Sequence, residues 1–402
     1  ISGFYWLNYL LIILIFISTN ASSQVPDLPK IMDENTSISE WKNNRKDELT
    51  RLFREYMYGS INDTSFNVDY DVNERHFYIG EVKALQKEVK ITVFNQRDTI
   101  SFDLLIFHPE KQEFKLFVGL NFYGNHTVHP DPRIRITESW TRNNPNFTIF
   151  NHTPSPSSRG VRHYRWPVER IIERGYGVAT IYYGDIYPDH HSKTPYPIEQ
   201  MFPGNFSAIA VWAWGLQRAM DYFENDTDIN EKKVIVMGHS RQGKVALWAG
   251  AQDSRFAGVI SNNSGCGGAA ISRRKEGETV AAINQQFPHW FVDQFKSYND
   301  AEEELPVDQH MLLALIAPRP LYIASAEDDA WADPEGEYLA LYHAGPAWEL
   351  YGHRTMDEPE LPGINNPIHN AKAAYHIRSG EHDITRYDWE RFMDFFDQAI
   401  RD

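Results

Sequence analysis

Hydrophobic and polar positions along this chain follow two patterns, and their order predicts the fold. Val89, Ile91 and Val93 alternate with polar residues, and a denser hydrophobic run follows at 102–107, so both segments are expected to be strands. From residue 114 onward, short and largely hydrophobic runs alternate with loops and segments of helical spacing. These runs are expected strands at 114–122, 177–183, 234–237, 256–261, 320–325 and 373–377. Strands that alternate with helices predict an α/β protein with a doubly wound, mostly parallel sheet.

Helices are expected between these strands and at both ends of the chain. A polar helical region covers 38–57, and Pro167 begins a helix that continues to Ile172, since proline is tolerated in a first helical turn. Hydrophobic residues recur at helical spacing from Ile209 to Phe223 and again from Trp389 to Ala399. Residues 143–160 are rich in Asn, Pro and Ser, which is typical of a surface loop. Neither an internal repeat nor a linker divides the chain, so residues 24–402 are expected to form one domain.

The first residues resemble an export signal. Leu7 to Ile17 form a hydrophobic run that is short for a membrane span, and a small polar stretch follows up to Ser23. Residues 1–23 are therefore expected to be a secretory signal peptide, which starts at Ile1 without a methionine or basic residues and is expected to be truncated. The alternative is an N-terminal membrane anchor. With a cleaved signal, we expect a secreted or periplasmic protein without stable membrane association.

Composition and charge exclude several classes of partner. The formal net charge of −16 argues against nucleic acid, which needs clustered Lys and Arg, and no glycine-rich phosphate loop follows the first strands. The only cysteine, Cys266, excludes an internal disulfide framework and a zinc site built from several cysteines. Two clusters contain residue types that bind metals, but neither has the spacing of a recognised metal site, so no metal is expected. They are His190-His191 with Asp185 and Asp189, and Asp308 with His310.

A serine follows the short and wholly hydrophobic strand at 234–237. The strand at 234–237 ends at Gly238, and a segment of helix formers starts directly after Gly243. A serine on such a tight strand-to-helix turn, Ser240, has an exposed hydroxyl above helix N–H groups, the arrangement called a nucleophile elbow. The spacing G-x-S-x-x-G departs from the usual G-x-S-x-G, and a simple Gly/Ser helix cap is the alternative. The buried strand followed by a helix favours the elbow.

A nucleophilic serine needs a histidine base and an acid. In this fold the three follow one another along the chain in the order Ser, acid, His. His382 lies between the last expected strand and the C-terminal helix, where such a base is presented. Asp329 follows the strand at 320–325 and is our preferred acid, with Asp328 second. Glu327 and Asp333 also compete in this loop.

Together these residues resemble the glucuronoyl esterases, carbohydrate esterase family 15, in their bacterial form. The similarity is carried by Gly238-His-Ser-Arg-Gln-Gly-Lys, Arg165-Trp-Pro-Val-Glu, Tyr183-Gly-Asp-Ile, Asn263-Ser-Gly-Cys-Gly-Gly, Phe287-Pro-His-Trp-Phe, Ala317-Pro-Arg-Pro, Trp331-Ala-Asp-Pro and Gly380-Glu-His-Asp. The resemblance implies the α/β-hydrolase fold, no cofactor, and a serine esterase. Its substrate would be the ester that joins (4-O-methyl-)glucuronic acid of xylan to lignin alcohols.

The resemblance also implies roles for residues around the serine. Arg241 would stabilise the oxyanion through its backbone N–H and its guanidinium, which fits the need for fixed donors there. Lys244 would contact hydroxyls of the uronic acid, and Trp331 would line the sugar pocket. Glu278 is a further candidate for sugar contact.

One departure from the family pattern leaves alternatives open. Fungal members carry their triad acid as a glutamate at the position of Asn263, which cannot be negatively charged, so the acid role is expected to pass to Asp329 as in many bacterial relatives. One alternative is an esterase for acetyl-xylan or another carbohydrate O-acyl group. Another is a non-catalytic carbohydrate-binding protein on the same fold, which the loss of the glutamate would favour.

Overall fold

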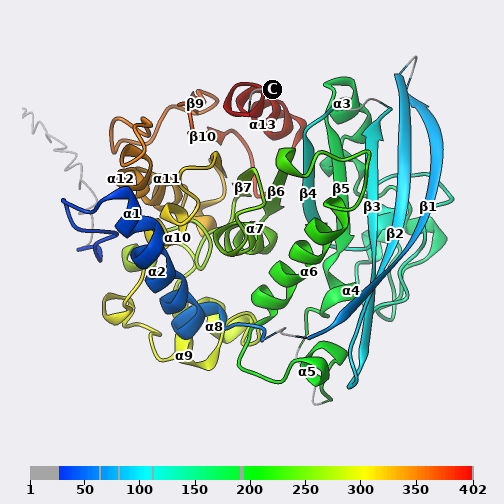
Figure 1. Cartoon of the computed structure of the whole chain (residues 1–402), viewed down its shortest axis with the longest axis horizontal. Coiled ribbons are helices and arrows are strands. Elements are labelled where there is room, and N and C mark those ends of the chain that lie inside the picture. Colours follow the sequence, from blue (N-terminus) through cyan, green and yellow to red (C-terminus); the bar gives the residue numbers. More distant parts are fainter. Residues whose placement is uncertain (1–26, 63–64, 80–81, 111–112, 191–193, 401–402) are drawn as a thin grey trace, which may run out of the picture.

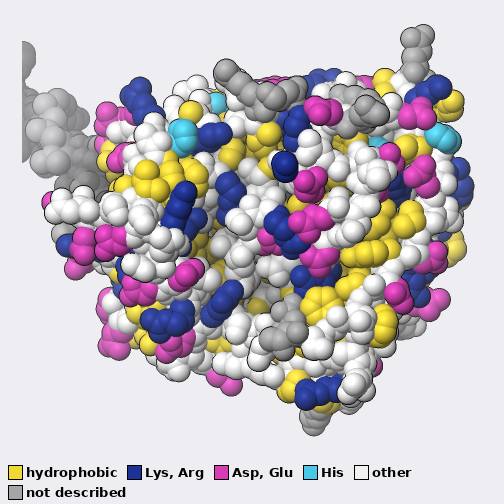
Figure 2. Space-filling view, viewed as in Figure 1, with side chains coloured by type: hydrophobic (Ala, Val, Ile, Leu, Met, Phe, Trp, Pro, Cys, Tyr) yellow, Lys and Arg dark blue, Asp and Glu magenta, His cyan; other side chains and the backbone are white. Residues whose placement is uncertain are grey.

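The computed structural model describes residues 27–62, 65–79, 82–110, 113–190 and 194–400 (Figure 1). The expected signal peptide at 1–23 lies outside these residues. Among the helices that are described, none is long and hydrophobic enough to cross a membrane. On the face shown in Figure 2, Lys and Arg side chains lie among Asp and Glu side chains rather than in one basic patch.

A single ten-stranded sheet runs through the molecule in the order β1-β2-β3-β5-β4-β6-β7-β8-β10-β9. The strands from β5 to β10 in this order pair in parallel, whereas β1, β2 and β3 form an antiparallel extension and β9 an antiparallel edge. The strands are β1 Asn67–Ile79, β2 Val82–Phe94, β3 Thr99–Pro109, β4 Leu116–Asn121, β5 Gly177–Tyr182, β6 Val234–His239, β7 Gly258–Asn262, β8 Leu321–Ala326, β9 Ile368–His369 and β10 Ala373–Arg378.

Helices cover both faces of the parallel strands. They are α1 Ile38–Glu40, α2 Lys46–Phe53, α3 Val168–Glu173, α4 Tyr183–Ile186, α5 Pro197–Met201, α6 Ala208–Phe223, α7 Arg241–Gln252, α8 Val280–Gln286, α9 Asp293–Lys296, α10 Gln309–Ala314, α11 Pro334–Ala344, α12 Pro346–Glu349 and α13 Arg386–Ala399. Side chains of β6 alternate between two cores because a strand points successive residues to opposite faces. Val234 and Val236 pack with α6 and α7, whereas Ile235 and Met237 pack with α3 and α13.

Most expected elements are present with small shifts in their ends. The six expected runs from residue 114 onward correspond to β4, β5, β6, β7, β8 and β10, and the helices expected near 167, 209 and 389 are α3, α6 and α13. The region 38–57 is helical, with π-helical turns at Trp41–Arg45 and Arg54–Tyr58. Residues 143–160 form an irregular loop with short 3-10 turns. The doubly wound, mostly parallel sheet predicted from the sequence is confirmed.

The carboxyl ends of the parallel strands bring the candidate residues to one edge of the sheet. Ser240 follows β6, Asn263 follows β7, Asp329 follows β8, and His382 follows β10. Parallel strands place their carboxyl ends at the same edge, which is where open α/β sheets bind their ligands. Four segments that are distant in the sequence therefore meet above the sheet.

Candidate active site

The turn between β6 and α7 holds Ser240 in a backbone conformation that few side chains adopt, with φ 59° and ψ −132°. Two glycines make this turn possible. A Cβ on Gly238 would lie 1.8 Å from the carbonyl oxygen of Gln242, and one on Gly243 would lie 2.8 Å from Cβ of Ser264. The spacing G-x-S-x-x-G is therefore explained by two close approaches of the backbone, and the expected strand-turn-helix geometry is present.

His382 and Asp329 form a close pair beside this turn. Nδ1 of His382 lies 2.5 Å from Oδ2 of Asp329, and the same oxygen accepts a 2.9 Å hydrogen bond from the side-chain amide of Asn263. Burial by itself raises the pKa of Asp329, but the contacts from His382 and Asn263 outweigh it and lower the pKa. Asn263 thus supports a carboxylate that stands in the following loop instead of supplying one itself.

The competing carboxylates of this loop face elsewhere. Glu327 and Asp328 are exposed, whereas Asp329 is buried. Asp333 accepts from Arg274 Nε at 2.9 Å and from the backbone N–H of Gly336 at 3.0 Å, which caps α11. Of the four candidates for the acid, Asp329 is the one that contacts His382.

A cleft of about 320 Å³ opens at this point, a volume suited to a small ligand. It brings together the seven site residues singled out in the sequence. The lining residues are Ser240, Arg241, Lys244, Asn263, Ser264, Gly265, Glu278, Gln286, Phe287, Trp290, Asp329, Trp331, Ala332 and His382. Their polar groups converge on one side while Phe287, Trp290 and Trp331 supply aromatic surface.

The Arg241 side chain is fixed by a buried carboxylate. Arg241 Nη1 donates to Asp189, and the guanidinium carbon lies 4.5 Å from the centroid of the Trp290 ring. Asp189 also accepts from His289 Nε2 at 2.9 Å, from Trp290 Nε1 at 2.8 Å and from Tyr183 OH at 3.2 Å. Burial alone would raise the pKa of Asp189, but the bonds from His289 and Trp290 and the charge of Arg241 lower it. Asp189 is therefore ionised and holds the guanidinium in place.

Asp189 is a site residue that the sequence did not reveal. Its spacing to the neighbouring histidines lacks a recognised metal-ligand pattern, and nothing else in the sequence marks it. Its contact with Arg241 spans 52 positions along the chain. The segment at 287–291 is a motif of the family resemblance, but Asp189 lies outside the neighbouring motif at 183–186, so the resemblance did not indicate the contact either.

Lys244 lies at the floor of the cleft. Its side chain is buried, its Nζ donates to the carbonyl oxygen of Ser264, and Glu278 Oε2 lies 3.8 Å from Nζ. Burial lowers the pKa of Lys244, and the nearby charge of Glu278 opposes this effect. Trp331 is 56% exposed at the rim, and its carbonyl accepts from the backbone N–H of Glu278 at 2.9 Å. The structure thus brings Lys244, Glu278 and Trp331 around the same opening as Ser240.

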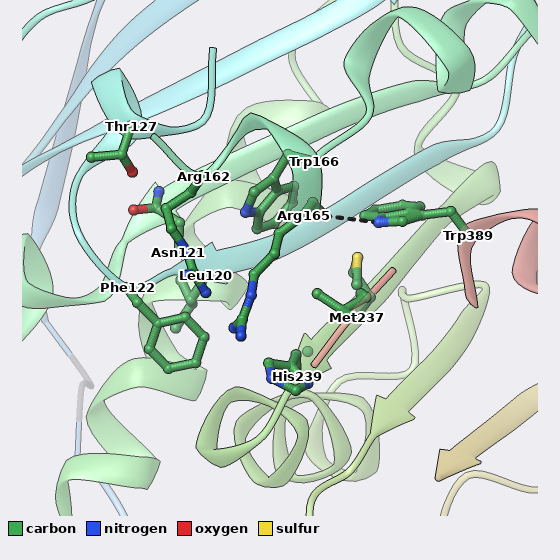
Figure 3. A pocket seen from close by; sticks show the side chains of 12 residues that line it. Leu120, Asn121, Phe122, Thr127, Arg162, Arg165, Trp166, Met237, His239 and Trp389 are labelled. Carbon is green, nitrogen blue, oxygen red and sulfur yellow. Dashed lines mark hydrogen bonds between the residues drawn. The ribbon is translucent and has the colours of Figure 1, made fainter. Parts of the chain in front are cut away.

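A second and much smaller cavity, of about 20 Å³, lies beside the carboxyl ends of β4 and β6 (Figure 3). Arg165 extends toward His239 in it, and the Arg165 carbonyl accepts from Trp389 Nε1 at 2.9 Å. A volume of this size holds about one water molecule. The cavity is therefore too small for a sugar ring.

Comparison with known proteins gives one relative that matches nearly the whole chain and others that match a part of it. The family model described as "Glucuronyl esterase, fungi" matches residues 175–352. The chain is 46% identical over 389 residues to "Carbohydrate esterase MZ0003" from an unknown prokaryotic organism, which covers 94% of this chain and 89% of that protein. It is 36% identical over 155 residues to a "4-O-methyl-glucuronoyl methylesterase" of Podospora anserina, which covers 36% of this chain and 32% of that protein.

Solved structures agree with these matches. A promiscuous CE15 esterase from the marine bacterial metagenome superposes with a TM-score of 0.87 at 46% identity, over 94% of this chain and 98% of the other. A glucuronoyl esterase from Solibacter usitatus superposes with a TM-score of 0.86 at 40% identity, over 95% and 100%. The α/β-hydrolase fold expected from the sequence is confirmed by these neighbours.

Proposed function

Because this chain belongs to carbohydrate esterase family 15, the glucuronoyl esterases, we propose that it hydrolyses esters of (4-O-methyl-)glucuronic acid. The natural substrates would be the esters that join glucuronoxylan to lignin alcohols. The observation that carries the proposal is the arrangement of Ser240, the His382–Asp329 pair and Arg241 around one cleft. Relatives named 4-O-methyl-glucuronoyl methylesterases support the same substrate class.

The proposed reaction proceeds through an acyl-enzyme. His382 accepts the Ser240 proton as Ser240 Oγ attacks the ester carbonyl, and Asp329 stabilises the imidazolium that forms. The alcohol leaves with the proton from His382, and the uronic acid remains bound to Ser240. Water, activated by His382, then attacks this ester, which releases the uronic acid and restores the serine.

Arg241 has two donors for the negative charge that develops on the carbonyl oxygen. Its backbone N–H belongs to the first turn of α7, directly after the nucleophile, where N–H groups have no partner within the helix. Its guanidinium is held by Asp189, so little reorganisation is needed when the charge appears. These donors support the proposed role of Arg241 in the oxyanion site.

Sugar recognition in this proposal rests on three residues at the cleft. Lys244 and Glu278 offer a donor and an acceptor for the hydroxyls of the uronic acid, and Trp331 offers an exposed aromatic face. A cation near the nucleophile also suits an acidic sugar, because the product carries a carboxylate. Because the proposed substrate is an extracellular polysaccharide, we also propose that residues 1–23 are a signal peptide and that 24–402 form one exported domain.

The experiment that tests this function is hydrolysis of a benzyl glucuronate ester by the purified protein. We expect the parent protein to release benzyl alcohol, and Ser240→Ala to lose the activity. Asp328→Asn is the matched control for Asp329→Asn, because it changes an adjacent carboxylate that is exposed and lies outside the pair.

Three outcomes would contradict the proposal. Release of acetate from acetylated xylan, without release of benzyl alcohol, would assign the site to an O-acyl esterase. Equal rates for the parent protein and Ser240→Ala would show that the serine is not the nucleophile, and no hydrolysis of either ester would favour a binding protein.

A further inference from the structure

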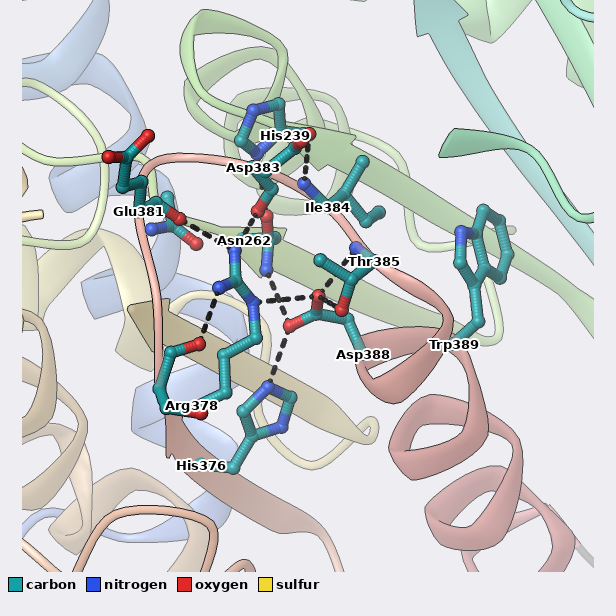
Figure 4. A network of polar contacts seen from close by, with 12 residues as sticks. His239, Asn262, His376, Arg378, Glu381, Asp383, Ile384, Thr385, Asp388 and Trp389 are labelled. Carbon is teal, nitrogen blue, oxygen red and sulfur yellow. Dashed lines mark hydrogen bonds and ion pairs between the residues drawn. The ribbon is translucent and has the colours of Figure 1, made fainter. Parts of the chain in front are cut away.

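One arginine donates to three backbone carbonyls of the loop that carries His382. Arg378, the last residue of β10, donates from Nη1 to the carbonyl of Ser379 at 2.9 Å. From Nη2 it donates to the carbonyls of Glu381 at 2.9 Å and Asp383 at 2.7 Å (Figure 4). Because two of these carbonyls belong to the residues on either side of His382, the guanidinium fixes the backbone immediately before and after it.

The arginine is itself held by a fully buried carboxylate, Asp388, in the first turn of α13. Arg378 Nε donates to Oδ2 of Asp388 at 3.0 Å, and Thr385 donates to the same oxygen from its N–H at 2.7 Å and its hydroxyl at 2.8 Å. His376 Nε2 lies 2.9 Å from the other oxygen, Oδ1. Burial alone would raise the pKa of Asp388, but the contacts of His376 and Arg378 lower it, so the carboxylate is charged.

The same carboxylate is linked to the Ser240 turn through Asn262 at the end of β7. The Asn262 amide donates from Nδ2 to Asp388 Oδ1 at 3.3 Å, which leaves its oxygen facing His239 Nδ1 at 2.6 Å. The backbone carbonyl of Asn262 accepts from the backbone N–H of Ser240 at 2.8 Å. Asn262 therefore connects Asp388 to both the side chain before the nucleophile and the backbone of the nucleophile.

The contacts of Asn262 also determine which ring nitrogen of His239 carries the proton. The ring centroid of His239 lies 4.7 Å from that of His382. Because Asn262 presents an oxygen, His239 carries its proton on Nδ1. Burial, together with the positive charge of Arg165 and of His382, holds the pKa of His239 well below its usual range. His239 is therefore neutral and adds no repulsion when His382 becomes protonated.

We propose that Asp388 and Arg378 are positioning residues that keep the Ser240 turn and the His382 loop in fixed relation to each other. The inference rests on the proposed function, since it takes these two residues as nucleophile and base. The turn follows β6 and the loop follows β10, and β7 and β8 lie between them in the sheet. β6 and β10 are therefore not paired directly. Asp388 reaches the His382 loop through Arg378 and the Ser240 turn through Asn262.

The test compares two arginines that each hold three backbone carbonyls. Arg319, just before β8, donates to the carbonyls of Gly250, Asp253 and Phe256, at the sheet edge opposite the cleft. Lysine keeps the charge but lacks the planar fork, so both Arg378→Lys and Arg319→Lys lose part of these bonds. The measured quantity is the rate at which a fluorophosphonate probe labels Ser240, at a temperature well below the unfolding transition of each variant.

We expect Arg378→Lys to label on the order of 10- to 100-fold more slowly than the parent, since small misplacements of reacting groups have effects of this size. Arg319→Lys should label at nearly the parent rate despite a comparable loss of thermal stability. In ester hydrolysis, Arg378→Lys should lower kcat with little change in KM, because the sugar contacts are untouched. Equal labelling rates for the two variants would overturn the positioning role.

A second variant removes one link of the path. Asn262→Ala retains the Arg378–Asp388 pair but breaks the side-chain contact to the Ser240 turn, and it should also slow labelling more than tenfold. Labelling at the parent rate in this variant, or in Arg378→Lys, would contradict the inference. Absence of labelling in the parent, with Ser240→Ala as reference, would instead contradict the proposed function, so the two failures are distinguishable.

Discussion

Replacing Asp189 with asparagine should release the guanidinium of Arg241. The carboxylate accepts from Trp290 and His289 at one oxygen and from Arg241 and Tyr183 at the other. An amide has only one oxygen, and the Trp290 N–H and the Arg241 guanidinium can both only donate, so one of the two loses its acceptor. The amide is also neutral, so in either orientation the guanidinium loses its charged partner. We therefore expect Arg241 to leave its place over the cleft.

The size of the effect has a ceiling. Removing one donor to an oxyanion typically lowers kcat by about 10²- to 10³-fold. Asp189 acts on the guanidinium and not on the backbone N–H of Arg241, so Asp189→Asn should lose no more than Arg241→Met loses. We expect a decrease of about 10- to 10³-fold in kcat and a smaller change in KM. In the double variant, Asp189→Asn should cause no further decrease, because no guanidinium remains to be positioned.

The assay is release of benzyl alcohol from benzyl glucuronate by the parent, the two single variants and the double variant. Asp185→Asn is the control, because Asp185 is also largely enclosed and its carboxylate accepts from Thr137 Oγ1 at 2.5 Å, outside the cleft. Burial raises the pKa of Asp185 to about 6, so an amide there replaces a group that is readily protonated. If the losses of Asp189→Asn and Arg241→Met multiply in the double variant, Asp189 acts independently of Arg241 and the reasoning is wrong.

Four further outcomes are expected. Asp329→Asn should lower kcat for benzyl glucuronate on the order of 10⁴-fold, as for other triad acids, whereas Asp328→Asn should stay near the parent; equal losses would contradict the assignment. Burial raises the pKa of Glu337 from 4.5 to about 7, so its stabilising contribution is complete below pH 4.5 and is lost as the pH rises through 7. The free energy of unfolding of Glu337→Gln, relative to that of the parent, should therefore rise by about 3 kcal/mol between pH 4.5 and 8 in thermal unfolding. A difference that does not change with pH would refute this. Lys244→Gln should raise KM for the uronate ester about tenfold, because one charged hydrogen bond to the sugar is lost. Hydrolysis of 4-nitrophenyl acetate, which has no sugar, should change little. Trp331→Ala should raise KM without lowering the melting temperature, since this side chain is 56% exposed; a large loss of stability would contradict a role at the rim.

The sequence predicted the central strands well because both faces of these strands are covered by helices. Every residue of β4, β5 and β6 is buried, and this leaves an unbroken hydrophobic run in the sequence. The edge strand β1 was not predicted. Its alternation at Val68, Tyr70 and Val72 is interrupted by the polar run at 73–76, and most of its residues are exposed. The short helices α8, α9 and α12 have four to seven residues each, which is too few for a helical period to be recognised.

The candidate site was predictable where a residue follows a strand directly. Ser240, Asp329 and His382 each stand after a recognisable strand, so the topology alone brings them to one edge. Asp189 and Asp388 could not be predicted in this way. In a sequence, a carboxylate that is buried against an arginine is indistinguishable from one in water, and only the packing of distant segments separates them.

The backbone conformation of Ser240 implies a conflict between catalysis and durability. A side chain at φ 59° is strained, typically by about 1–3 kcal/mol, and glycine would adopt the same turn without a Cβ. The chain in which Ser240 is replaced by glycine should therefore withstand heat better than the active enzyme. If Ser240 is the nucleophile, as proposed, natural selection keeps the less stable form because glycine has no hydroxyl to attack the ester. Laboratory selection for heat resistance alone would favour loss of the nucleophile, so a screen on this enzyme has to demand activity in every round.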